Sequence, residues 1–404
     1  MTAGATAVVR HVPDEQRRAR IAVRHGLAPA CRYPSVEAAA AAMTVLHATE
    51  AATVHLALAA RVHDVTAEDV DGALHVDRTV VKQLAMRRTL FAFPRDLVAY
   101  AWGSAAARTA ANELRSLQRA AVAAGLTDDA DSWWEHISTT ALERIEEHGP
   151  VAAQQVAALD PSLDARIRVG TGKWSTEVPL GPRVVSLLGV QGLLVRVGSL
   201  GHWRTNRPTW DLSARALPGL RPADSASGYR ELVRRWLWTF GPGTEEDVVW
   251  WLGSTKTVVR AALAELGAVA VSLDSGETGW LLPDDLDDVP APEPWAALLP
   301  VLDPTTMGWK GRTHYLDPED APYLFDSNGN AGTTAWWNGR VVGCWIQDAD
   351  GAVQVVLRPR DRERVGSVGE RLLEAEAERL TRWLGGQVIA SVYKSRQMKG
   401  EPLP

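Results

Sequence analysis

Residues 36–94 read VEAAAAAMTVLHATEAATVHLALAARVHDVTAEDVDGALHVDRTVVKQLAMRRTLFAFP. Apolar, alanine-rich segments predict one helix over residues 36–46 and a second over residues 51–62. The polar segment His47-Ala48-Thr49-Glu50 separates them. The stretch therefore begins as two short helices joined by a polar connection.

A third helix and a hairpin follow in the same stretch. Thr66 and Asp69 have the spacing of a capping box and predict a helix that ends near His75. Residues 79–93 are rich in β-forming side chains around a basic pair and predict a β-hairpin. Three short helices followed by a hairpin are the layout of a winged helix, a DNA-binding helix-turn-helix with an added ribbon.

Two short motifs in this stretch resemble those of the winged-helix DNA glycosylases of the AlkZ/YcaQ type. Members carry Gln-x-Gln or Gln-x-Asp after the first helix and roughly Met-Arg-Gly-Thr-Leu-His on the hairpin. This chain has the variant triplet His47-Ala48-Thr49 and the hairpin Met86-Arg87-Arg88-Thr89-Leu90-Phe91. The order of elements is similar, whereas both glutamine-type positions of the triplet differ.

The resemblance continues toward the C-terminus. Three further elements look like the same family: Leu299-Pro300-x-x-Asp303-Pro304, Gly308-Trp309-Lys310-x-Arg312 and Gly339-Arg340-Val341-Val342-Gly343-x-Trp345. The similarity therefore spans roughly residues 36–345.

Length and composition indicate a multidomain globular protein. The chain has 404 residues, of which 46% are hydrophobic and 23% charged, and this is ample for a core. Cys31 and Cys344 are the two cysteines and have no metal-ligand spacing around them, so we expect neither a disulfide nor a metal. There is no apolar run of membrane-spanning length and no secretory leader, which predicts a cytoplasmic protein without a membrane partner.

The net charge of −6 is unevenly distributed. Residues 1–125 contain 15 Lys and Arg against 11 Asp and Glu, and residues 162–221 contain 9 against 3. Acidic residues gather instead at 284–288 and 317–326. Two basic regions on an acidic chain favour a DNA-binding face with a solvated acidic back, and chance clustering of arginine is the alternative.

The winged-helix plan repeats along the chain. Helices are expected over residues 97–124, 134–147 and 152–159, strand-like alternation over residues 183–198, and a basic wing over residues 199–212. A third copy has helices over residues 229–240, 245–252 and 254–266 and a hairpin over residues 269–282. Strands near residues 333–345 and 351–357 and a final charged helix over residues 364–383 complete the chain.

These elements predict an α+β protein. Tandem winged-helix domains would form a concave DNA channel, closed by a small β-rich C-terminal domain. The expected domains are residues 1–125 (first winged helix with flanking helices), 126–222 (second), 223–290 (third) and 291–404 (β-rich domain).

The resemblance implies hydrolysis of an N-glycosidic bond at the triplet. An N3- or N7-alkylated purine is already cationic and departs readily, so little acid catalysis is needed and a pair of polar side chains that orients water then suffices. His47 would accept a proton from this water and Thr49 would hold the water by a hydrogen bond, so activity should fall at acid pH. The alternatives are a C-terminal helix histidine for His47 and the N-cap of the next helix for Thr49.

A second set of residues is expected to bind DNA. Arginine and lysine suit phosphate groups, and the loop after Gly308 could clamp the backbone around a lesion. Surface charge without a partner, or a tryptophan that anchors the core, is the alternative. The candidates are Lys82, Arg87, Arg88, Thr89, Arg204, Arg207, Lys256, Arg260, Trp309, Lys310 and Arg312.

The function expected is a monofunctional DNA glycosylase for alkylated or bulky purine adducts in double-stranded DNA. It would act as a monomer and without a cofactor, and no lysine lies near the triplet in sequence for Schiff-base lyase chemistry. The resemblance further implies unhooking of interstrand crosslinks, or self-resistance to a DNA-alkylating natural product. The alternative is a winged-helix DNA-binding protein without enzymatic activity, such as a regulator or lesion sensor.

Overall fold

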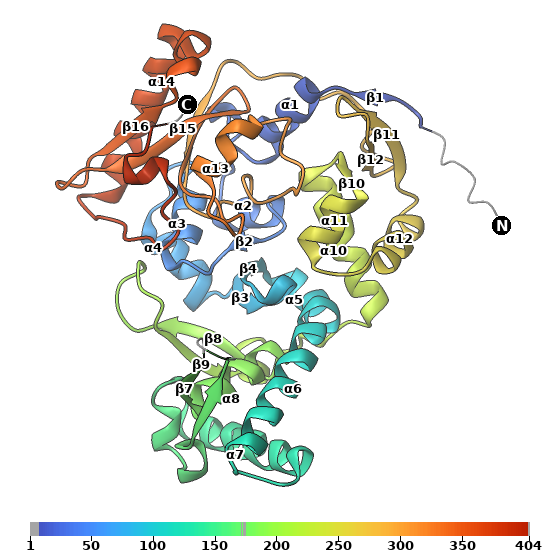
Figure 1. Ribbon diagram of the computed structural model, residues 1–404, viewed down its shortest axis with the longest axis vertical. Coiled ribbons are helices and arrows are strands. Elements are labelled where there is room, and N and C mark those ends of the chain that lie inside the picture. Colours follow the sequence, from blue (N-terminus) through green and yellow to red (C-terminus); the bar gives the residue numbers. More distant parts are fainter. Residues whose placement is uncertain (1–7, 171, 173–174, 403–404) are drawn as a thin grey trace. The chain divides into compact units, whose positions relative to one another are not determined.

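The computed structural model describes residues 8–170, 172 and 175–402 (Figure 1). Tertiary contacts divide the chain into two compact units: unit 1 consists of Met1–Val70 and Tyr229–Pro404, and unit 2 of Asp71–Gly228. Both combine helices with several small sheets, which confirms the predicted α+β class. The division into four domains and the concave channel remain predictions.

Unit 1 begins with a strand and four short helices. They are β1 (His11–Val12), α1 (Asp14–Arg24), α2 (Val36–Ala42), α3 (Ala51–Ala59) and α4 (Ala67–Asp71). Ser35 caps α2, and the predicted capping interactions between Thr66 and Asp69 are present at the start of α4. The first helix is shorter than expected, because the chain leaves it at Ala42 and forms the two-residue strand β2 (Leu46–His47).

Arginines of α1 pack inward. Arg17 is 6% exposed and Arg20 is 2% exposed. Arg20 donates to a carboxylate oxygen of Asp285 at 2.8 Å, and Arg24 pairs with the same carboxylate. Asp285 is therefore buried against two arginines of α1. The acidic segment 284–288 is thus not entirely a solvated acidic surface, as the charge distribution had suggested.

The segment expected to form the third winged helix has the predicted order of elements. It contains α10 (Ser225–Phe240), α11 (Glu245–Leu252), α12 (Lys256–Glu265) and the hairpin β11 (Val269–Leu273) with β12 (Thr278–Leu281). Thr244 and Asp247 form the capping box of α11, and Gly253 ends it with a φ of 59°. Strand β10 (Gly243–Thr244) extends the hairpin on one side and β1 pairs in parallel on the other.

The C-terminal part of unit 1 is an antiparallel sheet covered by a long helix (Figure 1). The strands are β13 (Ala296–Leu299), β14 (Thr334–Trp337), β15 (Arg340–Gln347) and β16 (Val353–Leu357), in this order. A short helix, α13 (Ala321–Leu324), precedes β14, and α14 (Arg362–Leu384) packs on the sheet. The strands expected near residues 333–345 and 351–357 and the final helix expected over residues 364–383 are thus present.

Unit 2 contains the first predicted hairpin and a helical layer. Strands β3 (Val80–Leu84) and β4 (Leu90–Pro94) pair antiparallel around the basic turn. Helices α5 (Arg95–Ala101), α6 (Ala107–Ala123) and α7 (Ala130–His148) follow, with a π-helical turn, Trp102–Ala106, between the first two. Short strands β5 (Val151–Ala152), β6 (Arg166–Val169) and β7 (Thr176–Pro179) come next.

Two expectations for unit 2 are wrong. Residues 183–190 belong to helix α8 (Leu180–Val190). Residues 152–159 contain the last residue of β5 and a single 3₁₀ turn, Val156–Ala158, in place of an α-helix. Helix α8 is short and mostly apolar, with Arg183 and Ser186 as its polar side chains, so periodicity alone separates it poorly from a buried strand. The hairpin β8 (Leu194–Ser199) with β9 (Pro208–Leu212) does lie at the expected wing, before the short helix α9 (Ser213–Ala216).

Among the residues that the structure describes, no helix combines the length and apolar character needed to cross a membrane.

Candidate active site and DNA-binding residues

The triplet lies between β2 and α3 in unit 1. His47 is 6% exposed and Ala48 is 2% exposed, whereas Thr49 is exposed to solvent. His47 is in a strand, so it is not a helix C-terminal histidine, and the N-cap of α3 is Glu50 rather than Thr49. Both structural alternatives for the two catalytic candidates are therefore wrong, and their catalytic role stays a prediction.

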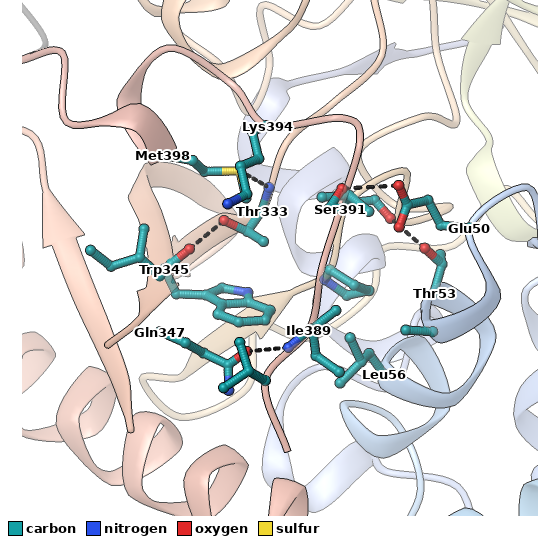
Figure 2. Close-up of a pocket in the computed structure, with 15 residues that line it drawn as sticks. Glu50, Thr53, Leu56, Thr333, Trp345, Gln347, Ile389, Ser391, Lys394 and Met398 are labelled. Carbon is teal, nitrogen blue, oxygen red and sulfur yellow. Dashed lines mark hydrogen bonds between the residues drawn. The ribbon is translucent and has the colours of Figure 1, made fainter. Parts of the chain in front are cut away.

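Glu50 lines a cavity of about 160 Å³ inside unit 1 (Figure 2). Ser391 donates its hydroxyl hydrogen to Glu50 Oε1 at 3.1 Å, and the Val392 amide donates to the same oxygen at 2.7 Å. Lys394 lines the same cavity. Neither His47 nor Thr49 is part of this lining, so the cavity begins at the residue that follows the triplet.

Sequence reasoning missed both charged residues of the cavity. Glu50 was visible as the fourth residue of the polar segment, and its position before α3 was the available signal. Lys394 lies more than 340 residues away along the chain, so no local pattern connects it with the triplet. In the fold, Lys394 lines the same cavity as Glu50, the residue that follows the triplet.

Asp303 of the Leu-Pro-x-x-Asp-Pro element binds a buried arginine. The guanidinium of Arg61, just after α3, donates to the two Asp303 carboxylate oxygens at 2.9 and 2.6 Å, and both side chains are 0% exposed. Arg61 also donates to Ala57 O and Thr305 Oγ1. The Leu-Pro-x-x-Asp-Pro element is thus linked to the end of α3 by the ion pair between Arg61 and Asp303.

Trp309 is a core anchor. It is 2% exposed, and its indole N–H donates to Phe240 O at 2.9 Å. A Cβ on Gly308 would lie 2.5 Å from the Phe240 ring, so glycine is needed for this close approach. The position of Trp309 does not fit direct contact with DNA and instead matches the core alternative.

Two buried histidines surround Trp309. His25 stacks at a centroid distance of 5.8 Å and His314 meets the ring edge-on at 4.8 Å. Burial lowers the pKa of His25 to about 3 and lowers the pKa of His314 well below its usual value. Both are neutral members of the core at physiological pH.

Three of the predicted DNA-binding cations lie close to carboxylates in the first turn of α11. Arg260 pairs with Glu245 at 2.6 Å, Lys256 lies 3.9 Å from the same carboxylate, and Lys310 pairs with Glu246 at 2.6 Å. Their charges are thus partly neutralised within unit 1. Arg312 instead lies over the ring of Phe325, with 4.4 Å from the guanidinium carbon to the ring centroid.

In unit 2, Lys82 occupies a poorly solvated position on β3. Desolvation is the main cause that lowers the pKa of Lys82 to about 8, with repulsion from Arg196 second and attraction to Asp71 opposing both. Arg196, on β8, has its own pKa lowered to about 10 by burial, and its guanidinium lies 4.9 Å from the Trp210 ring centroid. Lys82 and Arg196 therefore bring two positive charges into a poorly solvated part of unit 2.

The turn of the β3–β4 hairpin carries Arg87, Arg88 and Thr89. Arg87 and Arg88 are exposed and adopt positive φ angles of 52° and 57°. Arg88 pairs with Glu113 at 2.7 Å, and Thr89 is partly buried. Arg87 and Arg88 are thus the two exposed cations of this turn.

The turn of the β8–β9 hairpin carries Arg204 and Arg207. Arg204 is partly buried against His202, and its Nε donates to His202 Nδ1 at 3.1 Å. Arg207 is exposed, and no ion pair involves it within the described ranges. The structure therefore places Lys82, Arg87, Arg88, Thr89, Arg204 and Arg207 in unit 2, and His47, Thr49, Lys256, Arg260, Trp309, Lys310 and Arg312 in unit 1.

The described part of the chain holds no group of three or more His, Cys, Asp or Glu side chains that could bind a metal ion.

Comparison with known proteins identifies the family. The sequence matches the AlkZ-like DNA glycosylases over residues 40–383, which include the triplet and all three C-terminal elements. The fold is similar to that of the Streptomyces sahachiroi DNA glycosylase AlkZ, with a TM-score of 0.71 and 20% identity, over 94% of this chain and 98% of that one. None of the curated proteins matches. The chain belongs to the AlkZ-like family of DNA glycosylases.

Proposed function

We propose that this DNA glycosylase is monofunctional and hydrolyses the N-glycosidic bond of alkylated or bulky purines in double-stranded DNA. The observation that carries the proposal is the family match, which runs through the triplet. Thr49 is exposed to solvent, and His47 lies two residues before it in the same segment. Membership in an enzyme family also favours this proposal over a DNA-binding protein without activity.

The proposed reaction uses water as the nucleophile. An N3- or N7-alkylated purine is a good leaving group, so its bond to C1′ breaks with little acid catalysis. His47 takes the proton of the attacking water through a ring nitrogen, and the Thr49 hydroxyl orients the water oxygen toward C1′. The products are the free base and an abasic site.

The exposed arginines of the two hairpin turns in unit 2 are proposed to contact phosphates. Arg87 and Arg207 are exposed at these turns, whereas Lys256, Arg260 and Lys310 lie close to carboxylates of α11. Guanidinium groups bind phosphate oxygens through two parallel hydrogen bonds. Such contacts hold the duplex but do not choose the lesion.

A single-turnover reaction tests the proposal. Duplex DNA with one N7-methylguanine is expected to release the free base and to break at that position only after alkali. Breakage without alkali, or a covalent adduct trapped by borohydride, would show that an amine such as Lys394 attacks C1′ and that the enzyme is not monofunctional. Absence of base release from this and from other alkylated purines would contradict the proposed reaction.

Two extensions concern larger lesions. Unhooking of interstrand crosslinks is tested on a duplex crosslinked by a nitrogen mustard, with strand separation as the readout. Self-resistance to a DNA-alkylating natural product is tested by survival of cells that express the chain. Each extension fails on its own without affecting hydrolysis of simple alkylated purines.

A further inference from the structure

The cavity beside the triplet is enclosed by segments from distant parts of unit 1 (Figure 2). Helix α3 contributes Thr53 and Leu56, and strand β15 contributes Trp345 and Gln347. The C-terminal strap, which we define as residues 385–402, closes the cavity with side chains between Val388 and Met398. Its volume of about 160 Å³ is close to that of an engineered apolar cavity that holds benzene.

The strap is fixed at both ends of the cavity. The Ile389 amide donates to Gln347 Oε1 at 2.8 Å, and Ser391 and Val392 bind Glu50 Oε1. Farther along, the Gln397 side chain donates to Val356 O at 3.0 Å. The cavity is therefore formed by the fold and does not depend on a ligand to shape it.

Most polar groups of the lining already have partners. The Trp345 indole N–H donates to Leu299 O at 2.8 Å, and the Thr333 hydroxyl donates to Trp345 O at 2.5 Å. The Gln347 amide donates to Gly351 O and Gln387 O. Two charged groups remain available: within the described residues, no hydrogen bond reaches Glu50 Oε2 or involves Lys394 Nζ.

The apolar lining, Glu50 Oε2 and Lys394 Nζ together indicate which kind of ligand would fit the cavity. An indole and aliphatic side chains favour a planar, weakly polar ring. A carboxylate oxygen needs an N–H donor on the edge of that ring, and an ammonium group needs an acceptor. The Watson–Crick edge of guanine presents N1–H and N2–H₂ donors next to the O6 acceptor. Adenine presents a bare N1 acceptor there, which a carboxylate repels.

We propose that this cavity is a guanine-base site that holds the excised base after hydrolysis. Glu50 Oε2 accepts from N1–H and N2–H₂, and Lys394 donates to O6. Alkylation at N7 leaves this edge intact, and the free base is neutral once its bond to C1′ is broken. The assignment of an excised base to the site rests on the proposed function, because Glu50 follows directly after Thr49.

Binding of free bases to the whole protein tests the site without using catalysis. Calorimetric titration with 7-methylguanine is expected to show one site, and 3-methyladenine is expected to bind at least tenfold more weakly. Glu50→Gln keeps a carbonyl oxygen for Ser391 and Val392 but replaces Oε2 by an NH₂ donor. This variant should lose at least tenfold in affinity for 7-methylguanine, because a donor then faces N1–H and N2–H₂.

Two further variants make the result specific. Glu68→Gln removes an exposed carboxylate of α4 in unit 1 and should leave binding unchanged. Lys394→Ala removes the proposed O6 donor at an exposed position, and should weaken the binding of 7-methylguanine more than that of 3-methyladenine. Unchanged circular dichroism of Glu50→Gln excludes loss of the fold as the cause.

The outcomes separate this site from the proposed function. Base release from DNA without measurable binding of 7-methylguanine, or equal binding by Glu50→Gln, would overturn the guanine site and leave the glycosylase proposal standing. Tight, Glu50-dependent binding in a protein that releases no base would support the site and contradict its use for an excised base. Equal affinity for both bases would overturn the assignment to guanine.

Discussion

Arg61 and Asp303 hold together two parts of unit 1 that are far apart in sequence. Both side chains are inaccessible to solvent and share two hydrogen bonds. Arg61→Met leaves the Asp303 carboxylate buried without its cation, which costs about 3–5 kcal/mol of unfolding free energy. Urea unfolding followed by circular dichroism measures this loss.

The matched control replaces both partners. Arg61→Met combined with Asp303→Leu removes the buried charge altogether, so the double variant should be more stable than Arg61→Met alone. A loss below about 1 kcal/mol in the single variant would show that this ion pair is not what couples α3 to the segment after β13.

Lys82 makes the stability of unit 2 depend on pH. Its folded pKa of about 8 is below the value of about 10.4 for an unfolded chain, so the unfolded state binds more protons between these values. The free energy of unfolding should therefore rise as the pH increases from 8 to 10.5. Below pH 8 the full penalty for the buried ammonium is present.

Replacement of this lysine isolates the effect. Lys82→Met should raise the unfolding free energy at pH 7 by about 1–2 kcal/mol, a value reduced for the partial exposure of the side chain. The difference between wild type and variant should shrink as the pH approaches 10.5. A constant difference across this range would mean that the ammonium group is well solvated.

At the scale of elements, the two hairpin turns of unit 2 present exposed arginines. If Arg87 and Arg207 contact phosphates, each change to alanine should reduce the slope of log affinity against log salt by about 1. Fluorescence anisotropy with duplex DNA at several salt concentrations measures the slope. Arg260→Ala is the control, because Glu245 already pairs with Arg260 and its loss should change the slope less.

If the slope of log affinity against log salt is the same for the three variants and wild type, DNA binds to other residues. Loss of affinity without a change of slope would indicate that the hairpin turns matter for shape and not for phosphate contacts. Only a reduced slope in Arg87→Ala and Arg207→Ala supports the predicted interface.

Sequence patterns predicted those elements whose boundaries have a local cause. Thr244, Asp247 and Gly253 set the limits of α11, and the structure has these limits. Helix α8 was missed because its apolar run is short and contains few polar side chains, a pattern that a buried strand also shows. Strand β2 was missed because two residues are too few for any pattern.

In the whole molecule, the three C-terminal sequence elements that resemble the family contribute residues to the core of unit 1. Asp303 binds Arg61, Trp309 packs between histidines, and a Cβ on Gly343 would lie 2.1 Å from Val356 O. The sequence could suggest the family from these elements. It could not show the cavity, because α3, β15 and the strap meet only through tertiary packing.

The rate of base release from duplex DNA with one N7-methylguanine, with enzyme in excess, tests the catalytic triplet most directly. His47→Ala should slow release at least a hundredfold, whereas His63→Ala, an exposed histidine after α3, should match wild type. Release by His47→Ala within about threefold of wild type would contradict the account, because hydrolysis would then not depend on the imidazole at the triplet.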